Sequence, residues 1–133
     1  VWDKTRKQAG FTSGKPWLPV SAEHQALSVS AQENDADSVL SHYRAVLAFR
    51  KSHAALADGD MHFLATNEDV LAFTRQKGDE RLLFVFNLRR GPQEISLPEH
   101  LSVKQVLPLP GMQGDVKDGS VMLGALDGFC AKI

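Results

Sequence analysis

The run Leu82-Leu83-Phe84-Val85-Phe86 is the stretch that decides the fold of this 133-residue chain. Every position in it is apolar, whereas a strand with one solvated face alternates apolar and polar side chains. Turn residues lie on both sides of it, at Lys77-Gly78-Asp79-Glu80 and at Arg90-Gly91-Pro92. We therefore expect this run to form a central strand that is covered on both faces.

Six further short runs surround this strand, and each is rich in β-branched, aromatic or alternating apolar residues. They lie in the second half of the chain and are separated by turn residues rich in glycine, proline, asparagine and aspartate. Together with Arg81–Asn87 they are Met61–Thr66, Val70–Gln76, Gln93–Leu97, Val103–Leu107, Ser120–Leu123 and Phe129–Ile133. Seven short strands at this spacing predict a mainly β domain, an antiparallel sandwich or barrel.

Upstream of the strands, the apolar residues recur at steps of three and four, which predicts one amphipathic helix from about Ala36 to His53. Asn34 or Asp35 can cap its start, because their side chains accept hydrogen bonds from unpaired N–H groups. Basic residues in its last turn suit the exposed carbonyl groups there. Its apolar face comprises Val39, Leu40, Tyr43, Val46, Leu47 and Phe49.

The first 34 residues show neither a helical nor a strand period. They contain both tryptophans, Trp2 and Trp17, and the second lies in a Pro-Trp-Leu-Pro sequence at 16–19. We expect a long functional loop whose order depends on what its tryptophans pack against. The chain opens without methionine and inside this pattern, so we expect it to be a fragment of a longer protein.

Composition and charge exclude several classes of protein. The formal net charge is -1 and the 15 basic residues are spread along the chain, which argues against nucleic acid as a partner. No apolar run approaches the roughly 20 residues that span a bilayer, so we expect no membrane partner. Cys130 is the only cysteine, which excludes an internal disulfide and favours a reducing, cytoplasmic location.

The residues do not form a self-sufficient catalytic or metal site. Gly10–Lys15 resembles a phosphate loop only faintly, because Ala9 and Pro16 occupy positions that need glycine and a magnesium-binding hydroxyl. His42 and His53 share the predicted helix but lie roughly 16 Å apart at its rise per residue, too far for one metal ion. A glycosidase needs two carboxyls about 5 to 9.5 Å apart, and no pair in the sequence is marked for that role. We expect no catalytic residue, no metal site and no cofactor in this chain.

Several blocks of the first 60 residues are similar to α-glucosidase-type enzymes of glycoside hydrolase family 13. The blocks lie in the order in which that family has them. They are Trp2-Asp3, Ala9-Gly10-Phe11-Thr12, Lys15 to Val20, Ser38-Val39-Leu40, Tyr43-Arg44, Leu47 and Arg50-Lys51. Val1, Gln8 and Ala36 depart from residues that the family often has there, which bears on specificity more than on membership.

The resemblance implies a domain organisation. Residues 1–57 would be the end of a (β/α)8 catalytic barrel, with a loop at 1–34 followed by the helix. Residues 58–133 would be the C-terminal β-sandwich that follows the barrel in this family. The resemblance also implies a retaining parent enzyme that acts on α-glucosidic bonds of oligosaccharides, with its catalytic Asp, Glu and Asp upstream of this chain. The fragment itself would be inactive and structural.

The resemblance places the loop on the face of the barrel that carries the active site. Trp2, Asp3, Gln8 and Phe11 would then form an outer rim for an α-linked gluco-oligosaccharide, although packing within the loop explains them as well. The helix face would pack on the missing barrel. Without the barrel, part of it would be covered by the sandwich or by a second copy of the chain in a homo-oligomer.

A different class of function stays open, namely a free-standing carbohydrate-binding or accessory β-sandwich module. Such a module would hold sugars through exposed aromatic side chains. Phe63, Phe73, Phe84 and Phe86 fall inside strand patterns, which predicts that they belong to the core instead.

Overall fold

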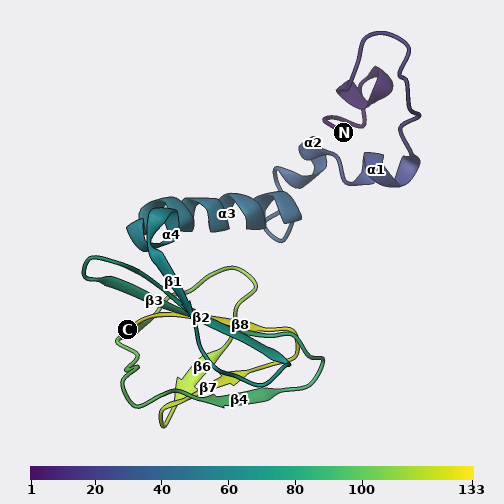
Figure 1. Ribbon diagram of the computed structural model, residues 1–133. Coiled ribbons are helices and arrows are strands. Elements are labelled where there is room, and N and C mark those ends of the chain that lie inside the picture. Colours follow the sequence, from purple (N-terminus) through teal and green to yellow (C-terminus); the bar gives the residue numbers. More distant parts are fainter. The chain divides into compact units, whose positions relative to one another are not determined.

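The central strand is β3, Glu80–Asn87, and it lies in the middle of a five-stranded antiparallel sheet (Figure 1). The computed structural model describes residues 1–133, and its contacts divide the chain into two units, Val1–Ala45 and Val46–Ile133. Each unit is described by itself.

The second unit contains two antiparallel sheets. The larger has the strand order β1-β2-β3-β8-β5, and the smaller has the order β4-β7-β6. Besides β3, the strands are β1 (Asp60–Phe63), β2 (Val70–Lys77), β4 (Gln93–Ser96), β5 (Gln105–Val106), β6 (Asp115–Lys117), β7 (Ser120–Leu123) and β8 (Gly128–Lys132). The predicted mainly β fold is confirmed, with eight strands where the sequence predicts seven.

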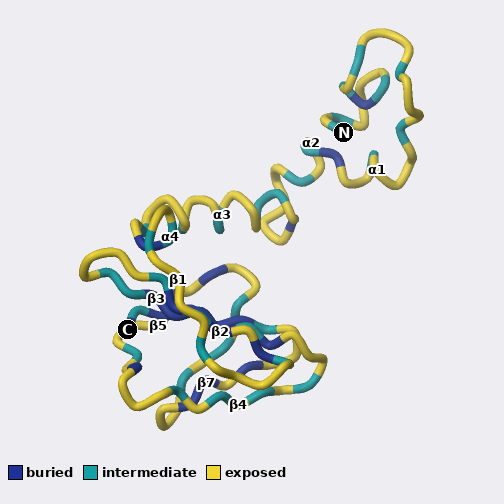
Figure 2. The backbone as a smooth tube through the Cα atoms, viewed as in Figure 1, coloured by how far each residue is buried: buried dark blue, intermediate teal, exposed yellow.

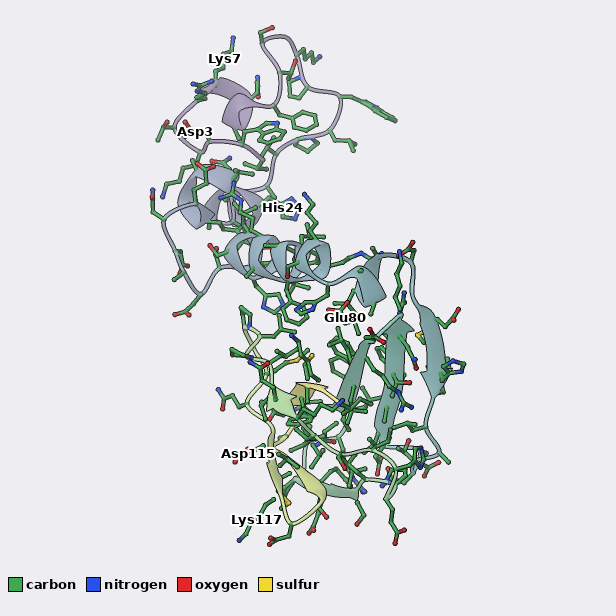
Figure 3. All side chains as sticks on the ribbon, turned by 90° about the vertical axis from the view of Figure 1, so that its left-hand side faces the viewer. Asp3, Lys7, His24, Glu80, Asp115 and Lys117 are labelled. Atoms are coloured by element: carbon green, nitrogen blue, oxygen red, sulfur yellow. The ribbon has the colours of Figure 1, made fainter.

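The additional strand is β6. It has only three residues, and two of them are the exposed, charged Asp115 and Lys117 (labelled in Figure 3). Its single half-buried side chain is Val116, which packs against the core between the sheets. A segment this short and polar has no apolar period, so only its pairing with β7 identifies it as a strand.

Both faces of β3 are covered, as its composition predicts. Leu83 and Val85 are fully buried among side chains of both sheets, which form the core of the sandwich. Leu82 and Phe84 point to the opposite face and are buried among α4, the 107–112 segment and the end of α3. Figure 2 shows β3 among the most deeply buried parts of the chain.

The predicted helix is α3, and it runs from Val39 to Ser52. It begins three residues later than expected, because Ser38 acts as the cap in place of Asn34 or Asp35. The Ser38 hydroxyl accepts from the Ser41 N–H at 3.2 Å, and the Ser38 carbonyl accepts from the His42 N–H at 2.9 Å. Asp35 instead closes the preceding turn, where its carboxylate accepts from the Asp37 N–H.

Two further short helical segments lie in the first 34 residues, α1 (Ala22–Ala26) and α2 (Val29–Gln32), along with the 3₁₀ turn η1 (Lys7–Gly10). Ser21 caps α1, since its hydroxyl accepts from the His24 N–H. No helix of the structure has the length and apolar character needed to span a membrane.

A one-turn helix, α4 (Ala54–Asp58), connects α3 to the first strand. Gly59 follows it at a place where two backbone segments meet. A Cβ atom at Gly59 would lie 2.5 Å from the Ala55 carbonyl oxygen and 2.6 Å from that of Gln76. The close approach of α4 and β2 therefore requires glycine at this position.

We expect Gly59→Ala to destabilise the second unit by about 1–3 kcal/mol, because both clashing atoms belong to the backbone and cannot move aside. Urea unfolding monitored by circular dichroism measures this loss. Gly91→Ala is the control, since a Cβ there would meet no atom within 4 Å. Equal stability of the two variants would contradict the proposed close approach.

Candidate functional site

The four predicted rim residues lie in one closed loop at the start of the chain. The N–H groups of Trp2 and Asp3 both donate to the carbonyl of Ala9, at 3.1 and 3.0 Å. This pairing places the Trp2-Asp3 segment beside the turn that carries Gln8 and Phe11 (Figure 3, which labels Asp3 and Lys7). The loop is also fastened to α2, whose Val29 and Ser30 N–H groups donate to the carbonyls of Val1 and Trp2.

The turn of this loop has an unusual backbone. Gln8, Ala9 and Gly10 have φ angles of 52°, 52° and 72°, all in the left-handed region. That conformation costs an ordinary residue about 1–2 kcal/mol, so it persists only where surrounding contacts impose it. Here the closure around Ala9, which is 5% exposed, supplies those contacts.

Asp3 is bound within its own loop. Its carboxylate accepts from the Thr5 N–H at 2.9 Å and from the Thr5 hydroxyl at 2.7 Å, and the Arg6 guanidinium lies 3.6 Å away. The hydrogen bonds from Thr5 are the main cause that lowers the pKa of Asp3 below its ordinary value. A general acid needs a pKa near the operating pH, so Asp3 is suited to bracing the loop and to accepting hydrogen bonds.

The other predicted residues differ in their accessibility. Trp2 and Phe11 are 60% and 68% exposed, and Gln8 is half-buried. The loop thus presents two aromatic side chains with surface available for contact. Trp17 is 94% exposed and lies with Phe11 at a hollow of about 440 Å³. Its lining residues are Phe11, Thr12, Lys15, Pro16, Trp17, Leu18 and Val20.

The titratable groups with shifted pKa values are engaged in holding the fold. Desolvation is the largest single effect on the Asp127 carboxyl and raises its pKa. The N–H groups of Gln113, Gly124 and Gly128 donate to this carboxylate, and these backbone bonds together outweigh desolvation, so the pKa of Asp127 is lowered. Glu80 binds the start of α4 in a similar way. No group of three or more His, Cys, Asp or Glu side chains lies close enough to hold a metal ion.

The aromatic residues of the sheet show one departure from expectation. Phe84 is buried, and Phe73 and Phe86 are half-buried and stack near it with ring centroids 5.3–6.3 Å apart. Phe63, by contrast, is 66% exposed. Its strand, β1, is the edge of the sheet and has no buried residue, so the strand pattern alone does not reveal the exposure.

Comparison with known families divides the chain close to the α4–β1 connection. Residues 1–59 match the model of the α-amylase catalytic domain, and residues 61–123 match the model of the maltogenic amylase C-terminal domain. The chain belongs to the α-amylase family. It combines the end of a catalytic domain with the C-terminal domain that follows it, which confirms the resemblance seen in the sequence.

Individual relatives agree with this assignment. The chain is 37% identical to a "Probable alpha-glucosidase" of Rhizobium meliloti (strain 1021) over its whole length, and 32% identical to a "Glucan 1,6-alpha-glucosidase" of Streptococcus pneumoniae over 99% of its length. A crystal structure of an "alpha-glucosyl transfer enzyme" matches 98% of the chain with a TM-score of 0.84 and 40% identity. In each case the chain spans 24% of the relative, so it corresponds to about a quarter of those proteins.

Cys130 is a core residue of the second unit and is predicted to be inert. It is 1% exposed, and desolvation raises the pKa of its thiol to about 12. Because the thiolate is the reactive form, we expect no alkylation of the folded chain by iodoacetamide at pH 8 and rapid alkylation in urea. Mass spectrometry of the two samples measures the difference, and modification of the folded chain at the rate of free cysteine would contradict burial of the thiol.

Proposed function

We propose that this chain is the C-terminal part of a retaining α-glucosidase-type enzyme that acts on α-glucosidic bonds of oligosaccharides. The observation that carries the proposal is the order of the two family matches, a catalytic-domain end followed by a C-terminal domain. The named relatives support the substrate class, since they include glucosidases for 1,6-linked glucans and oligosaccharides. In this proposal the chain stabilises the enzyme and supplies none of its catalytic carboxylates.

The structural partner in this proposal is the preceding part of the catalytic domain, which the chain would contact through α3. Val39, Tyr43 and Leu47 recur at steps of four and so lie on one side of the helix. They are 67%, 63% and 51% exposed, and α3 has no buried residue (Figure 2). A helix with an exposed apolar stripe needs a partner, because burying each such side chain stabilises by roughly 1.5–3 kcal/mol. Pairing of two copies through the same stripe is the alternative.

The proposal assigns residues 1–57 to the catalytic domain and 58–133 to the C-terminal domain, in a cytoplasmic enzyme. Trp2, Asp3, Gln8 and Phe11 would form the outer rim of its substrate site. The closed loop supports this role, because it gathers two exposed aromatic side chains and one ionised carboxylate on a restrained backbone.

The isolated chain is expected to release no p-nitrophenol from p-nitrophenyl α-glucoside, since the proposal places the catalytic carboxylates in the preceding segment. The measurement is absorbance during prolonged incubation at a high concentration of the chain. The complete Rhizobium meliloti relative, named a "Probable alpha-glucosidase", is assayed in parallel as the positive control. Turnover by the chain alone would show that it contains a catalytic site of its own.

Fragment complementation tests the partner. The Rhizobium meliloti relative without the quarter that this chain matches is expected to regain α-glucosidase activity when it is co-expressed with this chain. Tyr43→Asp with Leu47→Asp should reduce that recovery at least roughly tenfold, because charges on the stripe oppose its burial. Leu126→Asp, at another exposed leucine, is the control that should leave recovery unchanged. Sedimentation of the chain alone reports pairing of two copies.

A carbohydrate-binding module is the second candidate function, and the exposure of Phe63 favours it. This alternative predicts saturable, sugar-specific chemical shift changes around β1 when maltose or isomaltose is added to the chain. The enzyme-fragment proposal predicts no such changes in the β-sandwich.

A further inference from the structure

Four side chains from three elements, α3, β2 and β3, converge on α4, the single helical turn where the catalytic-domain match ends. The Glu80 carboxylate binds its start, and Figure 3 shows Glu80 at the end of the sheet that faces this turn. The guanidinium of Arg50 donates to the carbonyls of Leu56 and Ala57. The other two contacts are from Arg75 Nε to the Ala55 carbonyl at 3.1 Å and from Lys77 Nζ to the Asp58 carboxylate at 2.6 Å.

Both carboxylate oxygens of Glu80 form hydrogen bonds with the His53–Ala55 segment. Its Oε2 accepts from the Ala55 N–H at 2.8 Å, which satisfies a donor at the start of α4. Its Oε1 lies 2.6 Å from His53 Nδ1, and because an ionised carboxylate only accepts, the Nδ1–H donates. The His53 side chain is 13% exposed, and its ring packs on Phe49 with the centroids 4.4 Å apart.

We propose that Glu80 is an acid-sensitive latch between the two family domains. Its ionised carboxylate holds the His53–Ala55 segment, which belongs to the end of the catalytic domain, against β3 of the C-terminal domain. A proton taken from solvent onto either oxygen removes the negative charge that strengthens both hydrogen bonds, and the protonated oxygen becomes a poor acceptor for the N–H group that faces it. The neutral carboxyl therefore holds this segment more weakly, and the start of α4 is released. This inference goes beyond the proposed function and does not depend on it.

The other charged groups around Glu80 ensure that acid releases only the start of α4. Arg50 from α3 and Arg75 from β2 stay charged in acid, so they keep hold of the carbonyls of α4. Lys132 of β8 favours the ionised form of Glu80. Both side chains of the Lys77–Asp58 pair are exposed to solvent, so this pair contributes little to the stability of α4.

The hydrogen bonds of Glu80 determine how its contribution to stability changes with pH. The Ala55 N–H is the largest cause that lowers the pKa of Glu80 below its ordinary value of 4.5, and His53 lowers it further. A carboxyl whose pKa is lowered by folding stabilises the fold above its unfolded pKa and loses that contribution as the pH falls through its folded pKa. Glu80 therefore holds the start of α4 at neutral pH and releases it below pH 4.5.

An NMR titration of the chain from pH 7 to pH 3 tests the latch, because the Ala55 amide proton reports directly on the carboxylate that it contacts. We expect its chemical shift to titrate with a midpoint below 4.5, and its hydrogen exchange, corrected for the intrinsic rate, to rise roughly tenfold on acidification. The Val85 amide in the central strand should stay protected, which shows that the fold is intact.

Three variants distinguish protonation of Glu80 from other effects of acid on the chain. Glu80→Gln should abolish the titration of Ala55 and raise its exchange at pH 7. Asp58→Asn removes an exposed carboxylate of the same helix and should leave the titration unchanged. His53→Phe keeps the packing on Phe49 and should move the midpoint upward toward 4.5. An Ala55 shift that does not titrate in the unmodified chain, or that titrates equally in Glu80→Gln, would overturn the proposal.

Discussion

Burial of β3 on both faces is the constraint on which the second unit depends. Leu83 and Val85 fill the space between the sheets, while Leu82 and Phe84 form the floor on which α4 and the end of α3 pack. Each such side chain contributes roughly 1.5–3 kcal/mol when it is fully buried. A single strand thereby joins two apolar clusters, and the sheet order around it follows, with β2 on one side and β8 on the other.

Polar contacts from other elements order α4 in addition to this apolar packing. One helical turn cannot stabilise itself, since most of its N–H and C=O groups lack partners within the helix. Here Glu80, Arg50 and Arg75 supply those partners from three other elements. The turn is thus ordered by tertiary contacts, at the point where one family domain gives way to the next.

The first unit depends on closure of a loop. Hydrogen bonds from Trp2 and Asp3 to the Ala9 carbonyl hold three consecutive residues in left-handed conformations. This backbone keeps Trp2 and Phe11 exposed on a restrained scaffold. The proposed rim is therefore a set of positions fixed by main-chain bonds, with side chains available for a partner or a substrate.

The sequence by itself determined the mainly β class, the central strand and the single long helix, because continuous apolar residues and a period of three to four are local signals. The motif blocks likewise identified the family. Only the tertiary structure decided that Ser38 caps α3, that Asp115–Lys117 is a strand and that Phe63 is exposed. It also decided that Glu80, 25 residues away in sequence, binds the Ala55 amide. These features depend on which segments pair across space, and a local pattern of residue types carries no information on that.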